Sequence, residues 1–147
     1  MTEGSPDDAL RLPAGQGRRY AMGRLTAVFK ADGAETGNRY SASEWCLDPG
    51  QPGVGAHRHD ANDEIFLVLD GCPEFLVEGN WTVCPAGTFL RIPAGVTNDF
   101  RNAGPAPARF FSMFLGDGFE RNMPDIVAWF AARAPQTDSP AGQEPHA

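Results

Sequence analysis

Glycine and proline divide most of this chain into segments too short for anything but strands and turns. The 147 residues include 17 glycines and 13 prolines, spread along the chain rather than clustered. Glycine adopts turn conformations without steric cost, and proline removes a backbone donor, so neither suits the interior of a long helix or a central strand. This spacing is typical of an all-β protein with many short elements.

Apolar or alternating segments lie between these turns and predict roughly eight to ten short strands. The segments are 25–30, 39–47, 64–71, 74–83, 88–93, 97–102 and 108–115. Within 74–83, the Gly79-Asn80 pair predicts a tight hairpin turn. Residues 48–56, DPGQPGVGA, predict a loop.

The pattern changes to helical spacing only near the end of the chain. Ile126, Val127 and Phe130 recur at that spacing, and Pro124 suits a first helical turn, so a helix is predicted over 124–133. We expect one domain over 21–134, preceded by a flexible arm at 1–20 and followed by a disordered tail at 135–147. The predicted fold is an antiparallel double-sheet β-barrel, or jelly roll, with a C-terminal α-helix.

The charge of the chain argues against a nucleic-acid partner. Twelve basic and 19 acidic residues give a net charge of −7, which repels phosphate backbones. No apolar stretch approaches the ~20 residues of a membrane span, and the first twenty residues lack the plan of a secretory signal. We therefore expect a soluble, cytoplasmic protein. Its three widely spaced cysteines argue against a disulfide framework.

The segment HRHDANDE (57–64) carries the clearest chemical signal. His57 and His59 are two residues apart, so on a strand their side chains point to the same face. If 60–63 form a turn, the next antiparallel strand brings Glu64 beside both imidazoles. Two imidazoles and one carboxylate form a metal site that suits Fe(II), Mn(II), Ni(II) or Zn(II).

The alternative is that these are exposed polar residues in a loop. Two observations favour a metal site. The chain has three histidines, of which two lie in this motif and the third is His146. The segment that follows Glu64 is apolar, which would draw the group toward the interior.

The segment 57–71 resembles the first motif of the cupin superfamily, in its small single-domain form (the "cupin 2" barrel type). That motif is HxH, a glutamate after three or four residues, and a glycine after six more. The matching residues here are His57, His59, Glu64 and Gly71.

The segment 87–102 resembles the second cupin motif, with one departure. Family members carry Gly, five residues, Pro-x-Gly, two residues, His, three residues and Asn. The matching anchors here are Gly87, Pro93, Gly95 and Asn102, but the family's histidine is Asn98 in this chain.

The resemblance implies that His57, His59 and Glu64 supply three of the usual four metal ligands, with Asn98 in the fourth place. An amide oxygen is a weaker donor than imidazole. The site could keep three strong ligands and leave positions open for substrate, water or dioxygen. It could bind metal weakly, at low occupancy, or it could have lost metal and kept the barrel as a ligand pocket.

Strand alternation predicts which side chains surround this site. If Glu64 faces inward, Phe66 and Val68 do so too, and Phe100 follows Asn98 inward. These residues would line an apolar pocket over the metal.

The resemblance leads us to expect a metal-dependent enzyme that acts on an organic small molecule, with an Fe(II) oxygenase as one reaction type. A non-catalytic barrel that binds or senses a small molecule is one alternative. An isomerase, epimerase or cyclase that uses His57, His59 and Glu64 as acid or base is another. No separate general base can be identified, so no catalytic residue is assigned.

We also expect a homodimer. Small cupins usually associate, and Ile65 and Leu67 would point away from the metal face, leaving an apolar surface that needs cover. A monomer in which the terminal helix supplies that cover is the alternative.

Overall fold

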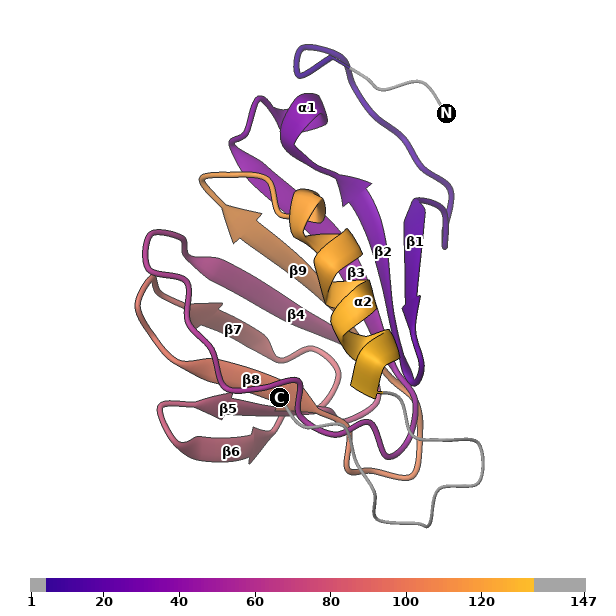
Figure 1. The fold of residues 1–147 in the computed structure, drawn as a ribbon, viewed down its shortest axis with the longest axis vertical. Coiled ribbons are helices and arrows are strands. Elements are labelled where there is room, and N and C mark those ends of the chain that lie inside the picture. Colours follow the sequence, from indigo (N-terminus) through magenta and orange to yellow (C-terminus); the bar gives the residue numbers. More distant parts are fainter. Residues whose placement is uncertain (1–4, 134–147) are drawn as a thin grey trace.

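Two antiparallel sheets form the fold of residues 5–133, which are the residues that the computed structural model describes (Figure 1). The six-stranded sheet has the order β1-β2-β3-β9-β4-β7, and the three-stranded sheet has the order β6-β5-β8. The strands are β1 (Arg18–Met22), β2 (Leu25–Ala31), β3 (Tyr40–Leu47), β4 (Glu64–Asp70), β5 (Glu74–Val77), β6 (Asn80–Val83), β7 (Phe89–Ile92), β8 (Asn98–Arg101) and β9 (Ala108–Leu115). The predicted antiparallel double-sheet fold is confirmed.

Two local predictions are wrong. The arm predicted for 1–20 contains the first residues of β1, which pairs with β2 from Arg18↔Phe29 to Met22↔Leu25. Its residues alternate in burial, but the segment RRYAM is too polar to read as a strand. The hairpin turn lies at Glu78-Gly79, one residue earlier than predicted. Both residues have positive φ, 49° and 88°, as a two-residue hairpin turn of this twist requires.

Side-chain alternation along the strands builds the core between the sheets. In β9 every second residue is buried, so Phe110, Ser112 and Phe114 face inward. Phe110 packs against Phe66 of β4 and Phe75 of β5, with ring centroids 5.3 and 5.1 Å apart. These contacts join the large sheet to the small one.

The described residues form two α-helices and one 3₁₀ helix. Helix α1 (Gly33–Thr36) is a single turn between β2 and β3, and the 3₁₀ helix η1 (Glu120–Asn122) leads into α2 (Met123–Arg133). The helix predicted over 124–133 is confirmed, one residue longer. In Figure 1, α2 lies across the large sheet, and Met123 at its start is fully buried. The tail predicted for 135–147 lies outside the described residues.

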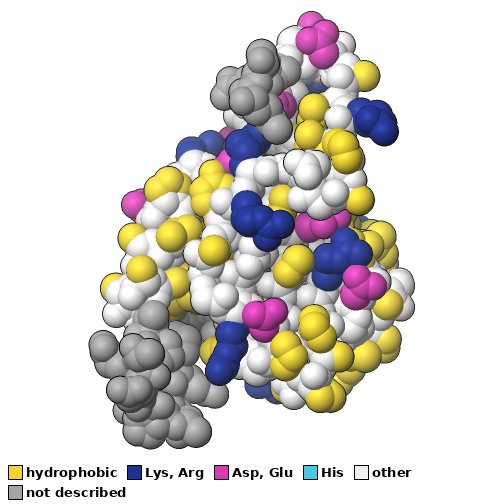
Figure 2. All heavy atoms as spheres, turned by 90° about the vertical axis from the view of Figure 1, so that its right-hand side faces the viewer, with side chains coloured by type: hydrophobic (Ala, Val, Ile, Leu, Met, Phe, Trp, Pro, Cys, Tyr) yellow, Lys and Arg dark blue, Asp and Glu magenta, His cyan; other side chains and the backbone are white. Residues whose placement is uncertain are grey.

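No single type of side chain dominates the side of the surface shown in Figure 2. Basic side chains there are interspersed with acidic and apolar ones. In the described part of the chain, no helix is both long and apolar enough to cross a membrane.

Candidate metal and ligand site

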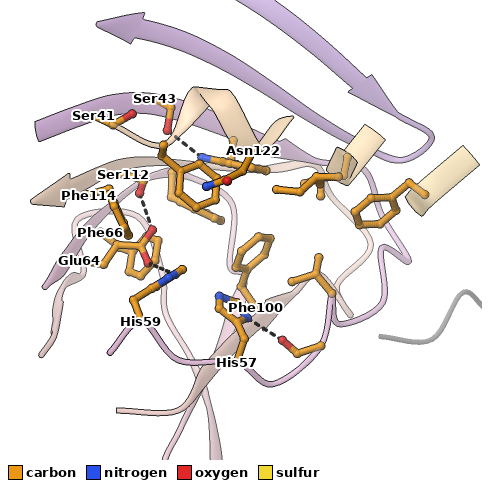
Figure 3. Close-up of a pocket in the computed structure, with 18 of the residues that line it drawn as sticks. Ser41, Ser43, His57, His59, Glu64, Phe66, Phe100, Ser112, Phe114 and Asn122 are labelled. Carbon is orange, nitrogen blue, oxygen red and sulfur yellow. Dashed lines mark hydrogen bonds and ion pairs between the residues drawn. The ribbon is translucent and has the colours of Figure 1, made fainter. Parts of the chain in front are cut away.

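A cavity of about 530 Å³ lies between the inner face of the large sheet, the loop that carries His57 and His59, and α2 (Figure 3). Its polar lining residues are Ser41, Ser43, His57, His59, Glu64, Ser112 and Asn122. Its aromatic lining residues are Trp45, Phe66, Phe100, Phe110, Phe114, Phe119, Trp129 and Phe130. A cavity of this size falls in the range of about 300–1,000 Å³ that is usual for small-molecule sites.

His57 and His59 reach the cavity from a loop rather than from a strand. His57 forms an isolated antiparallel bridge with Asn98, in which each backbone N–H donates to the other's carbonyl, at 2.9 and 2.7 Å. The His59 carbonyl accepts from the N–H of Gly95 at 2.9 Å. The strand geometry expected for these two residues is therefore wrong, but both rings still face the cavity, with centroids 5.2 Å apart.

Glu64 is the first residue of β4 and faces inward, with a side chain that is 14% exposed. Its Oε2 accepts a 3.0 Å hydrogen bond from Ser112 Oγ on the neighbouring strand β9. Its Oε1 lies 3.5 Å from Nε2 of His59 (Figure 3). The loop and the strand thus bring His59 and Glu64 together, as the spacing predicts.

Burial changes the acidity of these two groups. Desolvation raises the pKa of Glu64 to about 7, and the hydrogen bond from Ser112 opposes that shift. Desolvation also lowers the pKa of His59, with a further contribution from His57. Both shifts disfavour the charged forms, so at neutral pH the site holds a carboxyl group close to its midpoint beside a neutral imidazole.

Asn98 lies beside the cavity but is not among its lining residues. It is 1% exposed, and its Nδ2 donates to the carbonyls of Val96 at 3.3 Å and His57 at 3.5 Å. Its Oδ1 is buried and has no hydrogen-bond partner among the described residues. A buried oxygen without a partner is costly, which makes it a candidate contact for a group that the chain alone does not supply.

The predicted pocket-lining residues divide into two groups. Phe66 and Phe100 line the cavity, whereas Val68 lies in the core and is 1% exposed. Sequence reasoning missed Ser112 and Trp45, although the alternation in their strands places both on the inner face. It also left the terminal helix without a role in the site, although Ile126, Trp129 and Phe130 form one wall.

The donors fit a divalent transition metal in their chemistry. Nδ1 of His57 contacts the Gly55 carbonyl oxygen at 2.7 Å, so this nitrogen carries the proton in the neutral ring. The lone pair of Nε2 is then free to bind a metal. Glu64 Oε1 and His59 Nε2 are already neighbours. Within residues 5–133, however, no three His, Cys, Asp or Glu side chains meet in a ready-made ion cluster. His57 would have to close toward the other two.

Comparison with known proteins identifies the barrel. The family model described as a cupin domain matches residues 43–114. Over 92 residues, or 61% of its length, the chain is 35% identical to quercetin 2,3-dioxygenase of Bacillus subtilis. That match covers 26% of the relative, so the chain spans about a quarter of it.

Solved structures agree in fold. A predicted oxalate decarboxylase from Thermotoga maritima superimposes with a TM-score of 0.63 at 19% identity, over 74% of this chain and 98% of that one. The polyketide cyclase RemF from Streptomyces resistomycificus gives a TM-score of 0.66 at 16% identity, over 76% and 82% of the two chains. With the motifs, the double sheet and the family-model match, these similarities show that the chain belongs to the cupin superfamily.

Proposed function

We propose that this protein is a metal-dependent cupin enzyme that acts on an organic small molecule, with His57, His59 and Glu64 as the metal ligands. One observation carries the proposal. Three donors of the right chemistry, from a loop and an adjacent strand, face the same largely aromatic cavity. A divalent metal bound there would act as a Lewis acid and would orient the reacting group of the substrate.

The chain's own residues prepare this site. The contact between His57 Nδ1 and Gly55 keeps the other ring nitrogen free, and Ser112 favours the ionised form of Glu64. The aromatic walls make the surroundings of these donors largely apolar, and an apolar environment strengthens electrostatic interactions.

The reaction type is a further step in the proposal. Similarity to quercetin 2,3-dioxygenase favours an oxygenase, since it is a sequence match at 35% identity over 92 residues. The likeness to a polyketide cyclase is one of fold, and it supports the barrel rather than that reaction.

A metal titration tests the proposal. We expect the full chain, stripped with a chelator, to bind Mn(II), Ni(II), Zn(II) or anaerobic Fe(II) with one ion per chain in calorimetry. His57→Ala and Glu64→Gln should each abolish that binding. Asp60→Asn is the matched control, because Asp60 lies in the same loop with a side chain that is 81% exposed. It should bind metal like the parent.

Two outcomes would replace the proposal. If no ion binds, the barrel is a metal-free site, either a binding module or an isomerase-type enzyme that uses Glu64 and His59 as acid and base. If an ion binds equally to the parent and to His57→Ala and Glu64→Gln, the metal site lies elsewhere. Oxygen consumption by the metal-loaded protein, with quercetin as a first probe, then distinguishes an oxygenase from other metal-dependent cupins.

A further inference from the structure

Aromatic rings dominate the wall of the cavity. Eight of its twenty lining residues are Phe or Trp, and four are Leu, Val, Ala or Ile. The rings hold one another at steep angles. Phe100 and Phe110 are 5.0 Å apart at 73°, and Phe114 and Phe119 are 5.2 Å apart at 61°. A wall built this way offers fixed ring edges and faces, which favour another flat ring system through edge-to-face and offset contacts.

The same cavity offers no cationic side chain to an anionic ligand. All twelve lysines and arginines of the chain lie between residues 11 and 133, and none of them lines the cavity. Arg58 is next to both histidines in sequence, but its side chain is 61% exposed and pairs with Asp60 at 3.0 Å. A carboxylate or phosphate placed against the aromatic walls, away from the metal proposed at His57, His59 and Glu64, would therefore be buried without a partner, which is costly.

Neutral polar groups are present instead. Ser43 Oγ accepts a 2.9 Å hydrogen bond from Trp45 Nε1 and keeps its own hydroxyl proton for a ligand. Asn122, at the end of η1, adds an amide to the lining. Both suit hydroxyl or carbonyl groups on an otherwise apolar molecule.

Helix α2 supplies a part of the wall that lies outside the segment matched by the family model. Ile126, Trp129 and Phe130 line the cavity, whereas the family model ends at residue 114. The start of this segment is held in place, because Asp32 Oδ1 accepts from the backbone N–H groups of Phe119 and Glu120 at 2.7 and 2.9 Å. The wall thus lies outside the segment that the family model matches, and its start is held in place.

From these observations we infer that the cavity binds an uncharged, planar aromatic molecule that carries hydroxyl or carbonyl groups, and that α2 is the wall that selects it. The inference deepens the proposed function, on which it rests for the chemistry, by naming the substrate class of the same site.

Three probes with similar skeletons test the substrate class. 2-Naphthol is planar and neutral, 2-naphthoate is planar and anionic, and decahydro-2-naphthol is neutral but saturated and not planar. In calorimetry on the metal-free full chain, we expect 2-naphthol to bind at least about tenfold more tightly than either of the others. Equal binding of 2-naphthoate would overturn the exclusion of anions. Equal binding of decahydro-2-naphthol would overturn the aromatic class.

Substitutions in α2 test the role of the wall. Trp129→Leu combined with Phe130→Leu keeps apolar side chains and helical propensity but removes both rings. We expect the preference for 2-naphthol over decahydro-2-naphthol to fall at least about fivefold. The control is Trp81→Leu, since Trp81 lies outside the cavity beneath Arg101, at 3.9 Å. An unchanged preference in a folded double variant would overturn the assignment of α2, and the two single variants answer the same question if the double variant unfolds.

The design separates this inference from the proposed function. Probe binding is measured without metal, and metal binding is measured without probe. Selective 2-naphthol binding in a protein that binds no metal supports the inference and refutes the metal-dependent enzyme. Metal binding without 2-naphthol selectivity supports the enzyme and refutes the inference.

Discussion

Ser112 supports the carboxylate of Glu64 from the neighbouring strand, with a 3.0 Å hydrogen bond to Oε2. Burial and this hydrogen bond act in opposite directions on the protonation of Glu64. Burial raises the pKa of Glu64 to about 7, whereas the hydroxyl donor favours the charged form and lowers it. A carboxyl group balanced in this way changes its protonation state close to neutral pH.

The stability of the metal-free protein should therefore depend on Glu64. Between the ordinary pKa of 4.5 and about 7, the folded state keeps a proton that the unfolded state releases, so stability falls as pH rises through this window. The loss is at most about 3 kcal/mol. Urea unfolding with chelator at pH 5 and pH 7.5 should show this fall in the parent and its absence in Glu64→Gln.

His59 acts in the opposite sense, since its lowered pKa makes stability rise with pH up to about 6.5. The comparison with Glu64→Gln removes this contribution, because His59 is present in both proteins. An identical pH dependence in parent and variant would contradict the raised pKa.

Metal binding should tighten as pH rises. The carboxylate must lose its proton to bind an ion, so below the pKa of about 7 the affinity should rise at least about tenfold per pH unit, and then level off. Ser112→Ala removes the donor that favours the charged form, and should move the break to higher pH. Calorimetric titration with Mn(II) from pH 5.5 to 8 measures the pH at which the affinity levels off. A break at the same pH in both proteins would show that Ser112 does not act on Glu64.

Asn98→His should raise the affinity for Ni(II) or Zn(II). Asn98 pairs directly with His57 across an antiparallel bridge, and opposed residues in such a pair place their side chains on the same face. A ring at 98 would stand beside His57 as a fourth donor, and we expect a gain of about tenfold, or about 1.4 kcal/mol. Metal should raise the melting temperature more in the variant than in the parent. If Asn98→His binds metal no more tightly than the parent, and His57→Ala binds it equally well, then His57, His59 and Glu64 do not form a metal site.

The sequence predicted most of the barrel because turn residues and strand patterns agree along it. Residues 108–115 alternate strictly and form β9 with those bounds. Strand β1 was missed because Arg18 and Arg19 make it look like surface chain. The partner of its Arg18 side chain is distant in sequence, since Glu120 receives two hydrogen bonds from Arg18.

The candidate site was predictable in its residues but not in its geometry. Spacing placed His57, His59 and Glu64 on one face, and the structure brings them to one cavity. Spacing could not show that a loop carries the histidines, since their position depends on contacts with residues 95 and 98 in the second motif. Nor could it show that α2 folds back over the sheet, because amphipathic spacing identifies an apolar face but not the surface that it covers.

Gly71 and Gly79 give a matched test of the turns. Both have positive φ, 74° and 88°, so alanine at either position costs about 1 to 2 kcal/mol in backbone strain. At Gly79 a Cβ atom meets nothing within 4 Å. At Gly71 a Cβ atom would clash with the Pro107 carbonyl oxygen and would lie 2.8 Å from Ala108 Cα, so the backbone must move. Urea unfolding should show Gly71→Ala to be less stable than Gly79→Ala by about 2 kcal/mol. Equal losses would mean that the 71 turn is looser than this contact implies.

Arg18 ties η1, which leads into α2, to the rest of the fold. Arg18 makes paired hydrogen bonds to Glu35 at 2.6 and 3.1 Å and to Glu120 at 2.8 and 2.9 Å, and both carboxylates are largely buried. Removing the guanidinium leaves two largely buried carboxylates without their cation, and among the described residues only the Tyr20 hydroxyl and the Asp32 N–H still donate to them. Arg18→Ala should therefore lower the free energy of unfolding by about 3 kcal/mol. Because Arg18 lowers the pKa of Glu35, this stabilisation is present above the ordinary value of 4.5 and is lost as pH falls below it.

Two further variants isolate that effect. Arg121→Ala is the control, since Arg121 and Asp117 form an exposed pair and its loss should change stability little. Adding Glu35→Gln and Glu120→Gln to Arg18→Ala should recover part of the lost stability, because no buried carboxylate is then left without a cation. If the triple variant is instead less stable than Arg18→Ala, the arginine acts mainly through packing. Binding of 2-naphthol should weaken in Arg18→Ala, because η1 and α2 carry Asn122 and Trp129 to the cavity from this support.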